Sequence, residues 1–272
     1  MVTVLGHKGF IGSHIVEDLE TRGLPVFLPE RDEDLAGKKL GTVIFCIGLT
    51  ADAKRKPFDT INAHINKLVE IIRYSAFDRI VYSSSTRVYA HGREKAVSEE
   101  SLVPVNVADP FELFNLTKLT AESLLLNTVP DFKSVRFSNV YGTDSRSENF
   151  LTSILTSAIT DNRVTLHTAP GSAKDYIPVR DAAKITNDIA LKGTGRIYNV
   201  ASGINVSNQE ITDKMAAILG CDIVYAPDAK DYSFPPIDIS QIREEFGYQP
   251  ATTVLDDMEN LINSFKKDLK VL

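Results

Sequence analysis

Cysteines are scarce in this sequence and long apolar runs are absent, which narrows the class of protein. The chain has 272 residues and two cysteines, Cys46 and Cys221, which form neither a CxxC pair nor a metal-spaced set. We therefore expect a reduced intracellular compartment, no disulfide framework and no metal site. No apolar run approaches the ~20 residues that a membrane span needs. Residues 1–6 also lack the pattern of a signal peptide. These absences predict a cytoplasmic protein with no membrane partner.

Excess positive charge is absent as well. Lysine and arginine total 30 against 36 aspartate and glutamate residues, which gives a net charge of -6. Proteins that bind a phosphate backbone neutralise it with basic residues. We therefore expect no nucleic-acid partner.

The apolar residues that are present follow an alternating pattern. With 43% hydrophobic residues, the chain can bury a full α/β core. Short apolar runs predict strands, and the stretches between them have helical periodicity. The expected strands are 2–5, 26–28, 43–47, 80–82 and 135–137, and the expected helices include 11–20, 61–73 and 113–126. This alternation predicts an α/β fold, a Rossmann-type doubly wound parallel sheet.

The pattern changes from about Asp144 onward, where glycine and proline interrupt shorter elements. We expect residues 1–143 to form a dinucleotide-binding domain, to which segments near 175–200 return. Residues 144–272 are expected to form a smaller C-terminal lobe that binds the substrate.

A G-x-x-G-x-x-G run made by Gly6, Gly9 and Gly12 follows the first expected strand and opens the first expected helix. At a helix N-terminus, free N–H groups and the positive end of the dipole attract a diphosphate, and missing Cβ atoms let the backbone approach it. The alternative is a tight β–α turn without a ligand. The predicted cofactor-binding residues of this loop are Gly6, Lys8, Gly9, Phe10, Ile11 and Gly12.

Two neighbouring residues give opposite indications about the cofactor. Glu30 stands about 20 residues beyond the loop, where an acidic side chain can accept hydrogen bonds from ribose hydroxyls and favours NAD. Arg31 and Lys8 are cations suited to the 2′-phosphate of NADP. We expect NADP, with NAD as the alternative.

Two further segments carry candidate chemistry. Ser83, Ser84 and Ser85 end the strand around residues 80–82, at the sheet edge where doubly wound folds bind ligands. Phe114 and Lys118 stand four residues apart, and therefore on one face of the expected helix.

Taken together, these segments resemble the extended short-chain dehydrogenase/reductase family, in its nucleotide-sugar epimerase/dehydratase branch. The resemblance spans nearly the whole chain. Its other segments are Arg136-Phe137-Ser138-Asn139-Val140-Tyr141-Gly142, Lys174-Asp175-Tyr176-Ile177-Pro178-Val179-Arg180-Asp181, Tyr198-Asn199-Val200-Ala201-Ser202-Gly203, Asp238-Ile239-Ser240 and Phe246-Gly247-Tyr248-Gln249-Pro250.

The resemblance implies roles for individual residues. Ser85 would contact the sugar oxygen that is oxidised or reduced, with Thr86 and Asn139 beside the nucleotide-sugar substrate. Lys118, with Ser83, would hold the nicotinamide ribose. The implied reaction moves a hydride between the nicotinamide and a sugar carbon, as 4-keto reduction or C4 epimerisation. Relatives commonly pair through the helices that correspond to residues 113–126 and 61–73, so a homodimer is expected.

The chain departs from the family pattern at the catalytic position. The acid/base tyrosine that precedes the lysine by four residues is Phe114 here, so the proton-transfer hydroxyl is missing. Three explanations are open: an engineered Tyr→Phe change, which we favour, a natural enzyme with another acid, and a natural binding protein without chemistry. The substitute donors near this position are Tyr89, His91 and Thr86.

Two further departures constrain the fold and the reaction. The Asp-Glu pair that dehydratases use for elimination is replaced by Thr86 and Arg87, which disfavours elimination. The chain between Glu30 and Val43 is also short, so a strand and its helix are expected to be reduced or missing.

Overall fold

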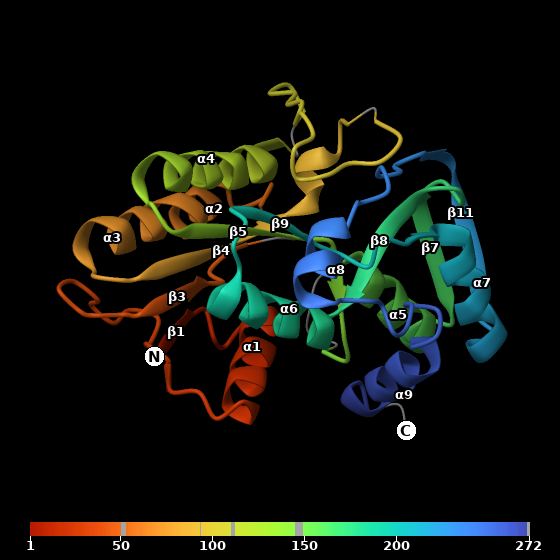
Figure 1. Ribbon diagram of the computed structural model, residues 1–272. Coiled ribbons are helices and arrows are strands. Elements are labelled where there is room, and N and C mark those ends of the chain that lie inside the picture. Colours follow the sequence, from red (N-terminus) through yellow and green to blue (C-terminus); the bar gives the residue numbers. More distant parts are fainter. Residues whose placement is uncertain (50–52, 93, 110–111, 145–148, 271–272) are drawn as a thin grey trace.

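The chain folds into a larger and a smaller lobe that lie side by side (Figure 1). The computed structural model describes residues 1–49, 53–92, 94–109, 112–144 and 149–270. None of the helices in these ranges is long and apolar enough to cross a membrane.

A six-stranded parallel sheet forms the centre of the larger lobe. Its strands, in spatial order, are β2 (Val26–Phe27), β1 (Val2–Leu5), β3 (Thr42–Phe45), β4 (Arg79–Ser85), β5 (Phe132–Phe137) and β9 (Ile197–Val200). The chain runs outward from β1 to β2 and then returns to the other side of β1 as β3. Ligands of such sheets bind at the carboxyl edge, close to this reversal of strand order.

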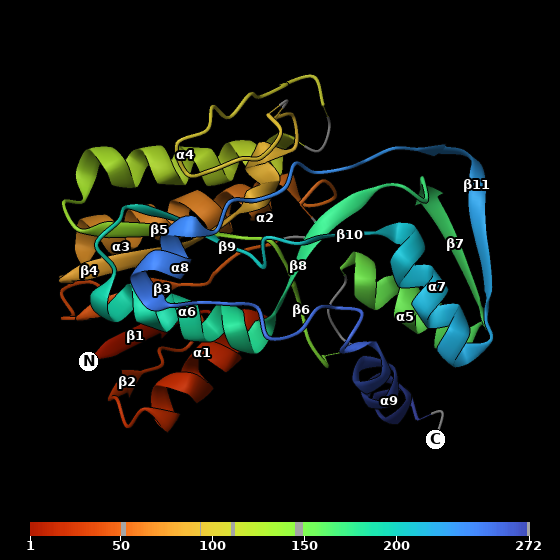
Figure 2. The same ribbon diagram turned by 45° about the vertical axis from the view of Figure 1, so that its right-hand side comes forward.

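Helices cover both faces of the sheet (Figures 1 and 2). One face carries α1 (Phe10–Thr21) and α6 (Val179–Lys192). The other carries α2 (Pro57–Ile61), α3 (Lys67–Tyr74) and α4 (Glu112–Thr128). Because both faces are covered, most residues of β1, β3, β4, β5 and β9 are buried on both sides of the sheet.

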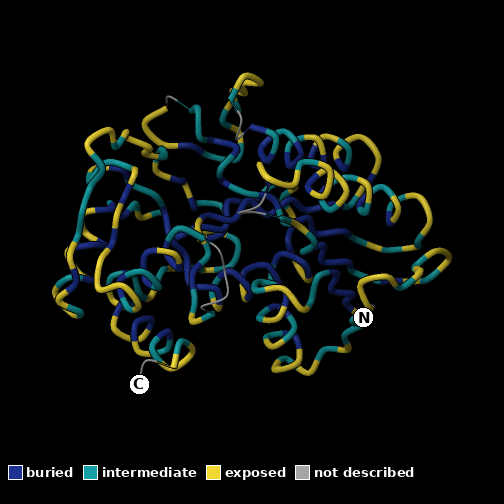
Figure 3. Tube along the Cα trace, turned by 180° about the vertical axis from the view of Figure 1, so that it is seen from behind, coloured by how far each residue is buried: buried dark blue, intermediate teal, exposed yellow. Residues whose placement is uncertain are grey.

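Alternate residues of these strands belong to two separate cores. Val4 and Ile44 pack with residues of α1 and α6, whereas Leu5 and Phe45 pack with residues of α3 and α4. Figure 3 shows this buried interior in dark blue and the exposed outer turns in yellow. The sheet is therefore a rigid support for the loops at its carboxyl edge.

The smaller lobe has its own strands, helices and core. One of its sheets contains β6 (Asn139–Tyr141), β8 (Ala173–Pro178) and β10 (Asn205–Ser207), and the other pairs β7 (Arg163–Thr168) with β11 (Asp222–Lys230). Three helices pack around them: α5 (Phe150–Thr160), α7 (Asn208–Leu219) and α9 (Met258–Asp268). A further helix, α8 (Ser240–Phe246), contacts α6 and β9 of the larger lobe.

The predicted Rossmann-type parallel sheet is confirmed, and so is the shortened segment after Glu30. Between β2 and β3 the chain forms only an isolated bridge, Lys39 with Ala76. The helix expected over residues 61–73 is not regular, because a π-helical turn, Asn62–Asn66, separates α2 from α3. The domain boundary placed at residue 143 stays a prediction.

Candidate active site

The glycine loop joins β1 to α1 and passes close to the end of β3. Gly6 has a φ of 82°, and a Cβ there would lie 2.9 Å from the carbonyl carbon of Cys46. A Cβ on Gly12 would collide with the carbonyl oxygen of Gly6. These two positions need glycine, because only glycine fits so close an approach or this backbone conformation.

The first turn of α1 fits a diphosphate. Gly9 is the N-cap residue, no side chain caps the helix, and the first turn has no acidic residue. The N–H groups of this turn have no partner within the helix, and the dipole is positive at this end. A dinucleotide diphosphate matches both properties.

The predicted determinants of cofactor preference form an ion pair at the end of β2. Lys8 Nζ lies 2.6 Å from Glu30 Oε2, and these side chains are 69% and 71% exposed. The hydrogen bond and charge of Lys8 hold the pKa of Glu30 below its usual value. Arg31 is the next residue and is exposed. The acidic and the basic groups are thus side by side, so both NADP and NAD stay candidates.

The serines that end β4 meet the end of β3 at the carboxyl edge of the sheet. Ser83 Oγ donates to Cys46 Sγ at 3.4 Å. Ser85 Oγ accepts the backbone N–H of Arg87 at 3.2 Å and caps the short 3-10 helix Thr86–Tyr89. Ser85 is half-buried, as a residue that contacts a ligand would be.

Lys118 reaches this edge from α4 and is almost fully buried, with 5% of its surface exposed. Its Nζ donates to the carbonyl oxygen of Ser83 at 2.7 Å. Burial lowers the pKa of Lys118 to about 7, and interactions with Cys46 and Glu122 offset only part of that effect. No carboxylate of the described residues pairs with its ammonium directly. The charge of Lys118 is therefore not neutralised by a direct ion pair. The side chain lies close to Cys46, the residue that the glycine loop approaches.

Phe114 lies one turn before Lys118, with its ring centroid 5.8 Å from the lysine Nζ. The His64 ring packs edge-on against it at 5.5 Å between centroids. The N–H of Leu49 donates to His64 Nε2 at 3.1 Å, so Nδ1 carries the proton and donates to Thr117 Oγ1 at 2.8 Å. Burial, and then the charge of Lys118, lower the pKa of His64 to about 3. This neutral histidine therefore fixes the start of α4.

Tyr89 is unavailable as a substitute for the missing hydroxyl. Arg136 Nη1 donates to the Tyr89 Oη at 2.6 Å, and Asn199 Oδ1 lies 2.9 Å from the same oxygen. The ring is 1% exposed, and burial raises the pKa of the phenol. The Tyr89 hydroxyl is thus used inside the core rather than at the sheet edge.

The partner of Arg136 is a buried carboxylate. Arg136 Nε and Nη2 donate to the two oxygens of Glu122 at 3.0 and 2.6 Å, and Ser134 Oγ donates to Glu122 Oε1 at 2.9 Å. Burial alone would lower the pKa of Arg136, but the hydrogen bonds and charge of Glu122 outweigh it and raise the pKa. Arg136 is therefore a structural cation under the sheet edge.

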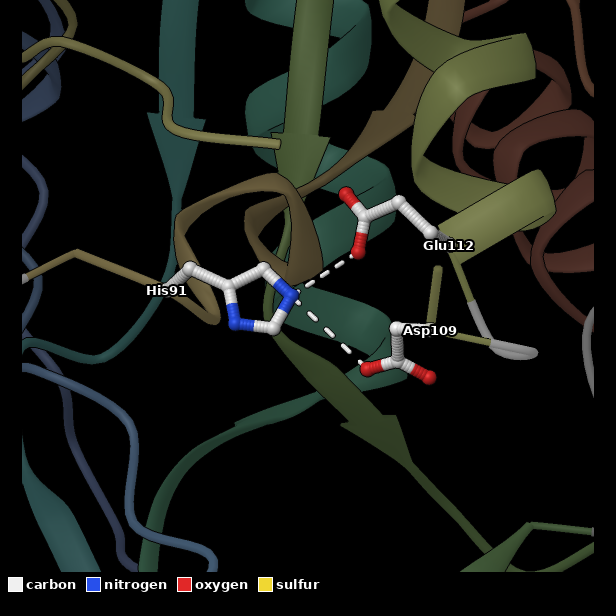
Figure 4. A group of neighbouring side chains, drawn as sticks. All are labelled: His91, Asp109 and Glu112. Carbon is white, nitrogen blue, oxygen red and sulfur yellow. Dashed lines mark hydrogen bonds and ion pairs between the residues drawn. The ribbon is translucent and has the colours of Figure 1, made fainter. Parts of the chain in front are cut away.

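Figure 4 shows His91 facing two carboxylates at the start of α4. His91 Nε2 lies 2.9 Å from Glu112 Oε2 and 3.8 Å from Asp109 Oδ2, and Glu112 is 2% exposed. Asn115 Nδ2 donates to the other oxygen of Glu112 at 3.4 Å. The cluster ties the loop after the 3-10 helix to the residues just before Phe114. The Nε2 atom of His91 is thus occupied by its contact with Glu112.

The smaller lobe contributes a second uncompensated cation, Lys174 of β8. Its Nζ lies 4.7 Å from the Phe150 ring centroid and 5.6 Å from that of Tyr232. Burial, and then the positive charge of Arg87, lower the pKa of Lys174 to about 8. No carboxylate of the residues that the structure describes forms an ion pair with Lys174. Lys174 is partly buried, and an anion bound beside it would compensate its charge.

The two other predicted substrate residues lie near the junction of the lobes. Asn139 begins β6, is exposed, and donates its amide to the carbonyl oxygen of Asp175 at 2.8 Å. Thr86 is 5% exposed at the start of the 3-10 helix. The side chain of Asn139 is thus accessible to a ligand, whereas only a small part of the surface of Thr86 is accessible.

The structure thus brings the loop of Gly6 to Gly12, the serines of β4 and Lys118 to one edge of the sheet. Glu30 and Arg31 lie at the neighbouring end of β2. Two residues near this edge were not predicted from the sequence, His64 and Lys174. Ile61, Ile65 and Leu68 keep regular helical spacing through this turn, so no signal in the sequence indicates the role of His64.

Comparison with known proteins assigns the family. Residues 36–201, more than half of the chain, match the model of the NAD dependent epimerase/dehydratase family. The chain therefore belongs to the NAD dependent epimerase/dehydratase family, in agreement with the extended short-chain dehydrogenase/reductase features described above.

Individual relatives are similar along their whole length. A putative UDP-glucose 4-epimerase of Methanocaldococcus jannaschii is 26% identical and aligns over 98% of this chain and 99% of its own. A dTDP-4-dehydro-6-deoxy-D-allose reductase of a Streptomyces species is 23% identical, over 92% and 91%. Relatives with different reactions share the same architecture, so the family does not select one reaction.

Solved structures have the same fold. MoeE5, in complex with UDP-glucose and NAD, superposes with a TM-score of 0.83 at 21% identity and covers 98% of this chain and 99% of its own. RMD from Pseudomonas aeruginosa, complexed with NADPH, gives a TM-score of 0.74 at 20% identity with the same coverage. Complexes with NAD and with NADPH thus both occur among structures of this fold.

Proposed function

We propose that this chain is an NAD(P)-dependent oxidoreductase of a nucleotide-activated sugar, which reduces a 4-keto group or epimerises C4. One observation carries the proposal. Lys118 is a buried, uncompensated cation, hydrogen-bonded to Ser83 and one turn after Phe114, at the edge where the uncapped start of α1 can hold a diphosphate. This arrangement positions a cofactor and a sugar against each other.

The cofactor site is divided among three groups of residues. The loop containing Gly6, Gly9 and Gly12 and the first turn of α1 hold the diphosphate. Glu30 and Arg31 face the adenosine ribose, where we propose NADP, with NAD as the alternative. Lys118 and Ser83 hold the nicotinamide ribose. The bound cofactor supplies or accepts the hydride.

The sugar site lies beside it. Ser85 donates a hydrogen bond to the sugar oxygen at the reacting carbon, and Asn139 and Thr86 contact the nucleotide sugar. Lys174 supplies a positive charge from the smaller lobe, which fits the diphosphate of a nucleotide sugar because no carboxylate of the described residues neutralises it.

Phe114 limits the chemistry. Its ring keeps the packing against His64 and Lys118, but it carries no hydroxyl to donate or accept a proton. General acid–base catalysis by a positioned side chain is commonly worth about 10²–10⁴ in rate. We infer that the chain has the positioning machinery of the enzyme and turns over slowly, as an engineered Tyr→Phe change would cause.

The substitution Phe114→Tyr tests this function. We expect the rate to rise about 10²–10⁴-fold with a 4-keto nucleotide sugar and NADPH, or in epimerisation of a UDP-sugar. Phe132→Tyr is the matched control, because Phe132 is also buried, at 1% exposed against 4% for Phe114. Phe132 begins β5 and pairs with Ile80, at the opposite end of the strand pair from Ser85, so its added hydroxyl should not raise the rate.

A second candidate is a catalytically silent sensor or scaffold that binds a dinucleotide and a nucleotide sugar. Phe114 favours it, because proton transfer has no agent at this position. If Phe114→Tyr binds cofactor normally and still shows no turnover with any substrate, the enzymatic proposal is wrong and this candidate replaces it.

Two chains are also proposed to pair through α4 and the adjoining helices. Exposed apolar side chains on these elements support the pairing: Leu126 of α4 is 54% exposed, and Phe58 of α2 is 84% exposed. A homodimer would cover such side chains. The cytoplasmic location stays a prediction.

A further inference from the structure

Three side chains with the chemistry of metal ligands converge at the start of α4 (Figure 4). One ligand atom from each of His91, Asp109 and Glu112 lies within 4.8 Å of the other two. His91 Nε2 is 2.9 Å from Glu112 Oε2 and 3.8 Å from Asp109 Oδ2. Ligand atoms at about 2.1 Å from a tetrahedral metal ion are about 3.4 Å apart. Small rotations of these side chains would therefore let them surround one ion.

Glu112 is not a solvated surface carboxylate, because it is only 2% exposed. Its side chain contacts His91 and the amide of Asn115, whose Nδ2 lies at the long distance of 3.4 Å from Glu112 Oε1. No lysine or arginine of the described residues forms an ion pair with Glu112. A buried carboxylate needs a positive charge to offset its desolvation. In this fold that charge comes only from a histidine, which is neutral unless it is protonated.

Asn115 provides an independent indication of a cation. Its side chain is 2% exposed, and its Oδ1 has no hydrogen-bond partner among the described residues. Nearly all buried polar atoms have a partner, and an exception indicates a missing ion or ligand. The two ends of an amide have the same shape, so a half-turn would direct Oδ1 instead of Nδ2 at Glu112. Two oxygens face each other favourably only when a cation lies between them.

The group is accessible from outside. The side chains of His91 and Asp109 are 32% and 27% exposed. A cavity of about 510 Å³ lies beside them, and His91, Glu94 and Asn106 are among its lining residues. An ion can therefore enter on the imidazole side and keep a water ligand there, whereas Glu112 and Asn115 close the inner side.

We propose that His91, Asp109 and Glu112 bind a divalent transition-metal cation, with Zn²⁺ as the expected ion and Asn115 Oδ1 as a further ligand. One imidazole nitrogen among carboxylate oxygens suits Zn²⁺ better than Mg²⁺, which prefers oxygen ligands and keeps its waters. Asp109 has a further interaction in the fold, and a ligating carboxylate commonly keeps such a second contact. No cysteine takes part, so the spacing of the two cysteines does not bear on this site.

The bound ion would join two segments beside the proposed active site. His91 follows the 3-10 helix Thr86–Tyr89, and Glu112 begins α4, two residues before Phe114. Zn²⁺ would replace the hydrogen bond between His91 and Glu112 by bonds to both, and would hold the start of α4 in place. Its role is therefore structural, and the proposal holds whichever reaction the chain catalyses.

Titration of the full-length, chelator-treated protein with Zn²⁺ tests the proposal by calorimetry. We expect one Zn²⁺ per chain with a Kd of about 10 μM or lower. Mn²⁺ should bind more weakly, in the usual order of these ions, and Mg²⁺ more weakly still. Zn²⁺ at about 100 times its Kd should raise the melting temperature by about 5–10 °C.

Variants of the ligands locate the ion. Glu112→Gln keeps the size of the side chain, and His91→Gln keeps a hydrogen-bonding group. Each should weaken Zn²⁺ binding at least about 100-fold, because the loss of an outer partner alone commonly costs about 10- to 100-fold. Asn115→Leu should weaken it about 10- to 100-fold. His167→Gln is the matched control, because it removes an exposed histidine of β7 in the smaller lobe, and it should leave the Kd unchanged.

Two results would overturn the proposal. If the wild-type protein binds Zn²⁺ with a Kd weaker than about 10 μM, the three residues form only a hydrogen-bonded cluster. If Glu112→Gln and His91→Gln bind Zn²⁺ as tightly as the wild type, the ion is held elsewhere, and thiolate charge-transfer absorption of the Co²⁺ form would place it at a cysteine. The melting temperature of each metal-free variant is recorded, so that a loss of fold in one variant is recognised and the other variant decides.

Discussion

The buried charges of the larger lobe and those at the junction of the two lobes have opposite surroundings. Glu122 and Arg136 are almost fully buried, paired through two hydrogen bonds, and supported by Ser134 and Tyr89. Lys118 is also buried and Lys174 is partly buried, yet no carboxylate of the described residues pairs directly with either.

We interpret this difference as the distinction between structural charges and charges that are proposed to bind ligands. In a buried pair each charge compensates the desolvation of the other, so it stabilises the folded state only while both are present. An uncompensated cation destabilises the fold on its own, and such groups cluster at functional sites. The pairing of a charge, rather than its burial, is therefore our criterion for assigning a residue to the proposed active site.

Breaking the buried ion pair between Arg136 and Glu122 should have the largest effect on the stability of the protein. Glu122→Gln keeps the shape of the side chain but leaves the Arg136 guanidinium buried without its counter-charge. We expect the free energy of unfolding to fall by about 3–5 kcal/mol, measured by urea denaturation. Glu70→Gln removes the exposed partner of Lys67 and should cost less than about 1 kcal/mol. Equal losses in the two variants would show that burial of the pair is irrelevant.

Lys118 has no direct ion pair, and we expect its titration to make the stability of the protein depend on pH. Burial lowers its pKa from 10.5 to about 7 in the folded chain. Between these values the unfolded chain carries a proton that the folded chain lacks, so the free energy of unfolding rises with pH, by up to about 1.4 kcal/mol per unit. Below pH 7 the buried amine is protonated and this gain is absent.

Lys118→Met removes the titrating group. The difference in unfolding free energy between wild type and variant should therefore increase from pH 7 to pH 9, when both are measured in urea without cofactor. If the unfolding free energies of wild type and variant instead change in parallel with pH over this range, Lys118 is neutralised by a counter-charge in the folded protein. The distinction between paired and unpaired buried charges would then be wrong.

The sequence predicts the parts of this site that depend on local pattern. The glycine loop, the serines of β4 and the Phe114–Lys118 spacing each lie within one strand–loop–helix unit, and strand order at the carboxyl edge brings these units together. The shortened segment after Glu30 was also predictable, because the number of residues there leaves no room for another strand and helix.

Features that depend on distant segments could not be predicted. The contacts of His64 arise from a π-helical turn, and neither apolar periodicity nor propensity distinguishes that turn from a regular helix. Arg87 and Lys174 come together only because β8 crosses to the junction of the lobes, so their mutual repulsion is invisible in the sequence. The pairing of Arg136 with Glu122 likewise joins α4 to β5.

Calorimetric titration of the purified protein with NADP⁺, and in parallel with NAD⁺, tests the central claim most directly. The loop from Gly6 to Gly12, the uncapped start of α1 and the uncompensated Lys118 together predict one dinucleotide bound per chain, and the cations Arg31 and Lys8 lead us to expect tighter binding of NADP⁺. Absence of binding heat with either dinucleotide, in a protein shown to be folded, would contradict the assignment of this edge of the sheet as an active site.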